Sequence, residues 1–157
     1  MIQYHIDYDD SQVQAMLTRL ERDMPEINRR ILGVLSEEVI SIAQKEYLRG
    51  GHPLNRRTGK LAQSMTYKVD SSGRHADVGT NLVYAAIHEF GGTIKPGIKG
   101  FLAWQSPSGE WVFTKKPVHI PPRPYLKPSL DDLFQTGRSV IVIERVLRQE
   151  LAARQPA

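Results

Sequence analysis

Two regions of helical hydrophobic spacing, separated by a stretch broken up by glycine and proline, restrict the folds open to this 157-residue chain. In the first region, apolar residues recur every three to five positions from Ile27 to Tyr47, on one broad stripe of a helix. Pro25 suits the first turn of this helix, so a shorter, separate helix is predicted before it. A last helix is predicted from Ser129 to the C-terminal tail, although the β-branched run at residues 140–143 is also compatible with a strand.

In the middle of the chain, glycine, proline and serine residues separate short apolar runs, which indicates short strands joined by turns. Residues 66–69 and 75–79 flank a Ser-Ser-Gly turn and predict a β-hairpin. Residues 82–90 are apolar around most of a helical circumference, which predicts a buried helix. An aromatic β-hairpin extension is predicted within residues 93–119, with its turn at Pro-Ser-Gly, and the proline-rich run 118–125 must be an extended strap.

This order of elements predicts an α+β fold in one domain covering residues 1–157. We expect an antiparallel β-sheet with two hairpins, packed against N-terminal helices, a short central helix and a long C-terminal helix. At the start of the chain, Ile2, Tyr4 and Ile6 alternate with polar residues, as in a strand. Residues 50–60 are polar, basic and rich in glycine, and predict an exposed basic loop.

Charge is distributed unevenly along the sequence. The formal net charge is +4, but residues 49–127 hold 12 Lys and Arg against 4 Asp and Glu, whereas the two flanks together hold 9 against 13. A basic middle between acidic ends is compatible with nucleic-acid binding, with contacts between oppositely charged faces of identical subunits, or with an ordinary solvated surface.

Several classes of function are excluded by what the sequence lacks. Without cysteine, the chain has no disulfides, thiol nucleophile or cysteine-based zinc site. No stretch approaches the roughly 20 apolar residues of a membrane-spanning helix, so we expect a soluble, unexported protein without membrane contact.

Two partial motifs lack residues that their chemistry requires. Residues 56–60 resemble the end of a phosphate-binding loop, but Leu54 replaces the required glycine and Leu61 the required Ser or Thr. The pair His88-Glu89 resembles a zinc-protease helix, but Gly92 stands where the second histidine belongs. No cofactor and no metal are expected.

Acid–base catalysis has few candidates in the central region, namely Asp77, His88 and Glu89. Glu89 lies near the end of the apolar helix, where an ionised carboxylate needs a partner, and Arg57 or Arg123 could form a structural salt bridge with it. Since nothing else indicates a nucleophile or a metal, we expect no enzymatic activity.

The aromatic hairpin combines aromatic and basic residues. Single-stranded nucleic-acid binders use such surfaces for stacking, and protein interfaces are also rich in aromatic residues. Alternation places Phe101 and Ala103 on one face and Leu102 and Trp104 on the other, so both faces carry apolar groups, which favours protein contact. The candidate residues for a subunit or DNA-channel interface are Arg56, Arg57, Lys60, Lys99, Trp104, Trp111, Lys115 and Lys116.

Four ordered segments resemble a known family. They are Arg-Thr-Gly-Lys-Leu at 57–61, Val-Gly-Thr at 78–80, Tyr-Ala-Ala-Ile-His-Glu-Phe-Gly-Gly at 84–92 and His-Ile-Pro-Pro-Arg-Pro-Tyr-Leu at 119–126. Together they resemble the virion-morphogenesis, or tail-completion, family of Mu-like tailed bacteriophages, with Tyr125 in place of the more usual Phe. The motif residues are Tyr84, His88, Glu89, Phe90, Gly91, Gly92, Arg123, Pro124 and Tyr125.

The resemblance implies a structural protein of the virion neck, made in the host bacterial cytoplasm. It implies a homo-oligomer, expected to be a hexameric ring, at the head–tail junction around the DNA channel. The implied partners are head-side connector proteins and tail tube or tail terminator proteins, with non-specific contact to packaged DNA as a further expectation. The alternative from the residues alone is a non-sequence-specific nucleic-acid-binding module.

Overall fold

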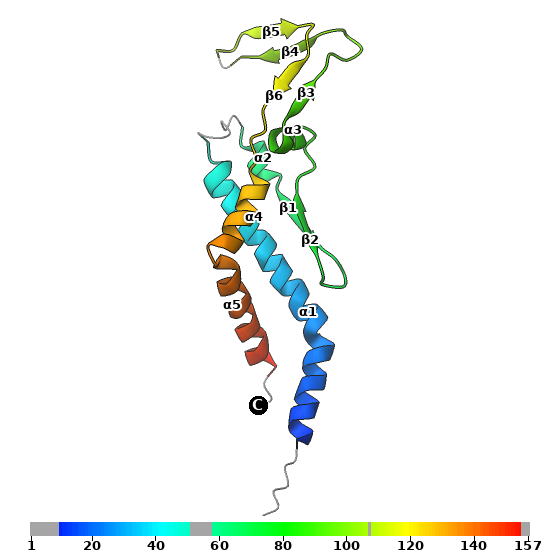
Figure 1. The fold of residues 1–157 in the computed structure, drawn as a ribbon, viewed down its shortest axis with the longest axis vertical. Helices are drawn as coiled ribbons and strands as arrows, with labels where there is room; N and C mark the ends of the chain where they lie inside the picture. Colours follow the sequence, from blue (N-terminus) through cyan, green and yellow to red (C-terminus); the bar gives the residue numbers. More distant parts are fainter. Residues whose placement is uncertain (1–9, 51–57, 107, 155–157) are drawn as a thin grey trace, which may run out of the picture.

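The computed structural model describes residues 10–50, 58–106 and 108–154 of the chain, which form an elongated mixture of helices and strands (Figure 1). The elements in chain order are α1 (Ser11–Ile42), the π-helix η1 (Ala43–Tyr47), α2 (Lys60–Gln63), β1 (Thr66–Val69), β2 (Ala76–Gly79), α3 (Ala85–Phe90), β3 (Gly92–Ile94), β4 (Leu102–Gln105), β5 (Trp111–Thr114), β6 (Val118–Ile120), α4 (Leu126–Gln135) and α5 (Arg138–Ala153). The α+β class is therefore confirmed.

Helix α1 runs through Pro25 as one 32-residue helix, so the prediction of two N-terminal helices is wrong. Proline lacks the N–H of one intrahelical hydrogen bond, but tertiary contacts hold the helix at this point. The turn between β1 and β2 lies against it: a Cβ on Gly73 would come within 2.6 Å of the Pro25 carbonyl oxygen. The Arg29 side chain also donates a hydrogen bond to the Ser71 carbonyl at 3.3 Å.

The end of the long helix widens into the π-helical turn η1. Here the Leu48 N–H donates to the Ala43 carbonyl at 2.8 Å, one residue further back than in an α-helix. The Tyr47 hydroxyl donates to Asp132 at 2.8 Å and ties this turn to α4.

The C-terminal helix is split in two, which corrects the prediction of one continuous helix from Ser129. Gly137 has a φ of 74°, in the left-handed region that favours glycine, and it separates α4 from α5. Residues 140–143 are helical, so the strand alternative is also wrong. Val142 and Val146 are buried, and this packing outweighs the weak preference of β-branched residues for strands.

The strands pair two by two, so the predicted antiparallel sheet consists of three separate two-stranded antiparallel sheets. Both predicted hairpins are present, with Tyr67 opposite Val78 in β1–β2 and Trp104 opposite Val112 in β4–β5. The sequence did not predict that β3 pairs with β6, where Thr93 lies opposite His119. This third sheet brings the two ends of the 93–119 extension together.

Two clusters of buried side chains form the core where α1 and η1 meet the rest of the chain. One cluster contains Ala43, Leu48, Met65 and Tyr125, and the other contains Val39, Ile42 and Leu133. Helices α4 and α5 run back along α1 (Figure 1). Sheet β4–β5 lies at the opposite end of the molecule from the start of α1 (Figure 1). None of the helices in the described ranges is long and apolar enough to cross a membrane.

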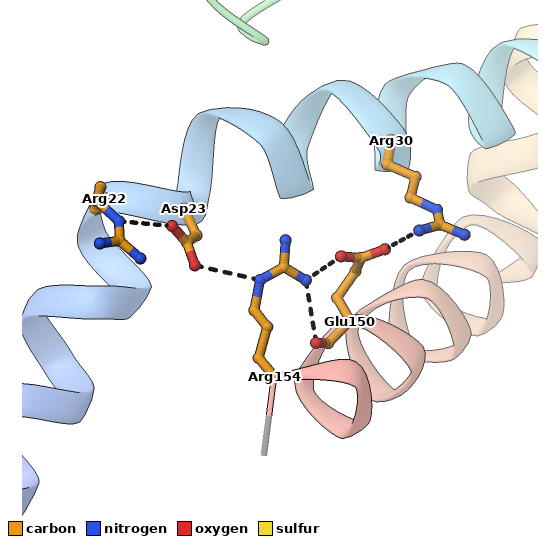
Figure 2. A network of polar contacts seen from close by, with 5 residues as sticks. All are labelled: Arg22, Asp23, Arg30, Glu150 and Arg154. Atoms are coloured by element: carbon orange, nitrogen blue, oxygen red, sulfur yellow. Dashed lines mark hydrogen bonds and ion pairs between the residues drawn. The ribbon is translucent and has the colours of Figure 1, made fainter. Parts of the chain in front are cut away.

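Helices α1 and α5 are also joined by charged groups (Figure 2). Glu150, which is only 4% exposed, contacts the guanidinium groups of Arg30 and Arg154. Arg154 reaches Asp23 at 3.3 Å, and Asp23 contacts Arg22 at 2.9 Å. The hydrogen bond from Arg154, ahead of the nearby Arg30 charge, holds the pKa of Glu150 below its usual value.

Candidate assembly interface

The segments 84–92 and 119–126 are connected through the carboxylate of Glu89 at the end of α3. Its two oxygens accept the backbone N–H groups of Tyr125 at 2.8 Å, Leu126 at 3.0 Å and Lys127 at 2.9 Å. These N–H groups belong to the first turn of α4, where a helix has unpaired donors and a partial positive charge. Glu89 is buried, so its negative charge is compensated by this helix end.

Among the described residues, the start of α4 supplies the hydrogen-bond partners of Glu89. Among the described ion pairs, none joins Glu89 to Arg123, and Arg57 lies outside the described residues. The physical reason is that three converging N–H groups can satisfy a carboxylate without a second buried charge. Both oxygens of the Glu89 carboxylate are engaged in these hydrogen bonds.

A close backbone contact completes the connection between these segments. The Arg123 N–H donates to the His88 carbonyl at 2.7 Å. Gly91 has a φ of 70°, and a Cβ at this position would lie 2.8 Å from the ring of Pro122. Both the backbone conformation and the space therefore require glycine here. Pro124 lies exposed on the same strap.

Tyr125 anchors the strap in the core. Its side chain is 1% exposed, within the cluster that contains Ala43, Leu48 and Met65. Burial, together with the nearby negative charge of Glu89, raises the pKa of the Tyr125 hydroxyl to about 12. Tyr125 is thus held as a neutral core side chain.

His88 lies half-buried between the strap and Tyr84. The two rings meet edge to face, with centroids 5.9 Å apart. The buried Nδ1 atom has no hydrogen-bond partner among the described residues. Burial, and secondly the charge of Arg123, lowers the pKa of His88 and favours the neutral ring. Across residues 10–50, 58–106 and 108–154, no three His, Asp or Glu side chains form a group that could hold a metal ion. Asp77 lies on β2, opposite Lys68.

Helix α3 is shorter and more exposed than predicted. It spans only residues 85–90, and within it only Ala85 and Glu89 are buried. Phe90 is 80% exposed, and Val83, just before the helix, is 97% exposed. The prediction of a buried helix is therefore wrong for a single chain. This helix of about one and a half turns packs one side against the strap, and its other side is exposed to solvent.

The aromatic hairpin β4–β5 also leaves large apolar groups uncovered. Its register places Phe101, Trp111 and Phe113 on one face, which we call the aromatic face. The Phe101 and Phe113 rings are 5.8 Å apart, and those of Trp111 and Phe113 are stacked at 6.4 Å. Trp111 is 65% and Phe113 62% exposed. The opposite face carries Trp104, which is also exposed, so the predicted alternation is confirmed.

Four lysines gather at the base of this hairpin. Lys95 and Lys99 lie in the connection from β3 to β4, and Lys115 and Lys116 lie in the connection from β5 to β6. All four are exposed, and none forms an ion pair with a described residue. We call these four residues the lysine base. No described ion pair offsets its positive charge.

The other predicted interface residues do not all join this surface. Lys60 begins α2, away from the hairpin strands, and Arg56 and Arg57 lie outside the described residues, as does most of the predicted basic loop. Four other exposed apolar residues of this surface were not among the interface candidates, and two of them, Val83 and Phe90, lie in the segment predicted to be a buried helix. The four are Val83, Phe90, Ile94 and Ile98.

Exposed aromatic side chains beside unpaired lysines, on a small α+β domain, are typical of a protein that assembles with others. Comparison with known families agrees. The model of the phage virion morphogenesis family matches residues 36–151, and the chain belongs to that family. Neither the curated proteins nor the solved structures contain a match to this chain. The family gives the protein a role in the morphogenesis of phage virions.

Proposed function

We propose that this protein is a non-enzymatic structural component of a tailed-phage virion, which forms a ring around the DNA channel at the head–tail junction. In this role copies of the chain contact one another and, on the two sides of the ring, a head-side connector protein and a tail tube or tail terminator protein. A hexamer is the proposed stoichiometry.

The observation that carries the proposal is the uncovered apolar surface at one end of the molecule. α3, the connection from β3 to β4 and hairpin β4–β5 together expose apolar side chains that a stable monomer would bury. The side chains with more than half of their surface exposed are Val83, Phe90, Ile98, Trp111 and Phe113. Partner proteins would cover this surface.

Charge supports a repeated contact between identical copies. The lysine base lies at the hairpin end, while the sequence flanks carry the excess of Asp and Glu. When one patch meets a different patch of the next copy, the contact repeats, and it closes into a ring if the rotation allows. Complementary charges steer such contacts and fix their orientation.

Electron microscopy of particles is the direct test. In a phage that encodes this chain, loss of the gene should yield separate filled heads and tails, and supplying the protein should restore joined particles. A map of the head–tail junction in complete particles should contain a ring whose density fits the α1, α4 and α5 helices. Normal joining in the absence of the protein, or a location elsewhere in the virion, would contradict the proposal.

A second candidate function is a non-sequence-specific nucleic-acid-binding module. It is favoured by the four unpaired lysines beside exposed aromatic rings, a combination that can neutralise phosphates and stack bases. This candidate predicts that the free protein binds single-stranded DNA with an affinity that falls steeply with salt concentration. The neck protein predicts weak binding by the free chain, so a fluorescence anisotropy titration at several salt concentrations separates the two.

A further inference from the structure

Sheet β4–β5 is incomplete as a structural unit. It has two strands, so each strand has one edge without a pairing strand in the described part of the chain. An isolated two-stranded hairpin is at best marginally stable, and a third strand with a hydrophobic face is the usual remedy. The aromatic face of this hairpin is already apolar but exposed. A third strand with apolar residues on one side would pair with a free strand edge and would also cover part of the aromatic face.

The first nine residues of the chain have the pattern of such a strand. Ile2, Tyr4, Ile6 and Tyr8 alternate strictly with the polar residues Gln3, His5, Asp7 and Asp9. All the apolar side chains of a strand with this sequence would lie on one face.

Charge determines the direction in which this strand fits. Its acidic residues Asp7 and Asp9 are at its C-terminal end, and the lysine base is at the end of the hairpin away from the turn. If the acids lie beside the lysines, the strand runs from the hairpin turn towards the base. β4 runs from the base towards the turn, so pairing with the free edge of β4 would be antiparallel.

Length determines which copy of the chain supplies the strand. α1 has 32 residues and so is about 48 Å long. The hairpin lies beyond the far end of that helix (Figure 1). Ten fully extended residues reach at most about 36 Å, so residues 1–10 of a chain cannot reach the hairpin of the same chain.

From these observations we infer that residues 2–8 of one copy add as an antiparallel strand to the free edge of β4 in a neighbouring copy, with Asp7 and Asp9 beside its lysine base. This inference rests on the self-association in the proposed function and names the surfaces that form it. In the register that places the apolar residues on the aromatic face, Ile6 lies opposite Phe101 and Tyr4 opposite Ala103. Each copy then gives one strand and receives one, which is a repeating head-to-tail contact.

Engineered cysteines provide the test, since the native chain has none. Two populations of the full-length protein, one with Tyr4→Cys and one with Ala103→Cys, carry different affinity tags and are mixed and oxidised mildly. A disulfide needs Cα atoms within about 7 Å, so the expected register gives a cross-link between the two tagged chains. The matched control is His5→Cys, which is adjacent in sequence but on the opposite face, and its yield should be at least tenfold lower. Ile6→Cys detects a register shifted by two residues.

A second pair of variants measures association without any cross-link. Ile2→Ser, Tyr4→Ser and Ile6→Ser combined should weaken self-association at least tenfold in sedimentation experiments, whereas Gln3→Ser with His5→Ser should leave it unchanged. If the copies associate but form no cross-link, and if both serine variants associate equally well, the inference is overturned. The proposed ring would not be contradicted by that result. The lack of any cross-link between the two tagged chains, in both the purified protein and assembled particles, would also overturn the inference. Absence of the protein from the head–tail junction would instead contradict the proposed function.

Discussion

The carboxylate of Glu89 accepts the backbone N–H of Tyr125 at 2.8 Å, across 36 positions of sequence. With the two further N–H groups that it accepts, this contact fixes the start of α4 to the end of α3. The exposed apolar surface of α3 and the hairpin is thereby held in a defined position on the helical body. The stability of this junction can be measured separately from any assembly.

Glu89→Gln should destabilise the fold. The amide group presents an NH₂ to an N–H donor and carries no charge to offset the helix end, and leaving buried donors unpaired costs about 1–3 kcal/mol. Urea denaturation measures the free energy of unfolding. Glu110→Gln, an exposed residue next to the β4–β5 turn, is the control and should change it little. Equal stability of the Glu89 variant and the native chain would show that the cap contributes nothing.

Gly91→Ala should destabilise the fold for a different reason. The positive φ and a Cβ 2.8 Å from Pro122 together force the strap away from α3, at a cost of about 1–3 kcal/mol. Gly97 has open space where a Cβ would lie and is not among the described glycines with positive φ, so Gly97→Ala is the matched control. Thermal unfolding of the two variants side by side tests the contrast, which disappears if the strap can move freely.

Tyr125→Phe should flatten the loss of stability at alkaline pH. The pKa of the buried hydroxyl is about 12 in the folded chain, above the usual value of 10.0. Its contribution to stability is therefore complete below pH 10 and decreases as the pH rises towards 12, where the unfolded chain releases this proton more readily. Urea denaturation curves at several pH values between 9 and 12 should diverge for the native chain and the variant. Parallel curves would contradict this assignment.

Glu150→Ala should lower the unfolding temperature. It leaves Arg30 and Arg154 without their shared buried partner between α1 and α5 (Figure 2). Glu144→Ala is the control, because the exposed Glu144 contacts only Arg148 at 3.9 Å among the described ion pairs. Because the pKa of Glu150 is lowered in the folded chain, its contribution is present above the usual carboxyl pKa and is lost as the pH falls. The native chain should therefore lose more stability than the variant on acidification.

Charge reversal at the lysine base should impair the joining of heads to tails. Lys115→Glu with Lys116→Glu places two negative charges where an acidic neighbour or DNA is expected. The control is Arg19→Glu with Arg145→Glu, an equal change on exposed helix residues with no ion pair in the described part of the chain. Complementation of a phage lacking the gene, scored as joined particles, is the measurement. Normal joining with both lysines reversed would remove them from the interface.

Local sequence signals predicted the hairpins and the family segments well. The Ser-Ser-Gly and Pro-Ser-Gly turns and the alternating apolar residues beside them depend on nearby residues, so the sequence contains the information directly. The start and end of helices were harder to predict. Proline is common in the first turn of a helix, but at Pro25 the β1–β2 turn packs against a continuous helix. Gly137 ends a helix that its neighbours would continue.

Contacts between distant residues could not be predicted. Glu89 and α4, Arg30 and Glu150, and the strands β3 and β6 are separated by loops whose course the sequence does not define. Four of the interface candidates, Trp104, Trp111, Lys115 and Lys116, are exposed in the single chain. Exposure in one chain does not by itself identify the partner, so their role at an interface stays a prediction.

The pairing of β3 with β6 holds together the two chain segments that lead into and out of hairpin β4–β5. The length of the hairpin can therefore vary while its base stays in place. Lengthening each outer strand by two residues would move the tip outward by about 7 Å and keep every side chain on its original side. Lengthening each by one would instead turn Trp111 and Phe113 to the other side. The reach of this projection can therefore change in steps of two residues per strand without any change to the helices beneath it.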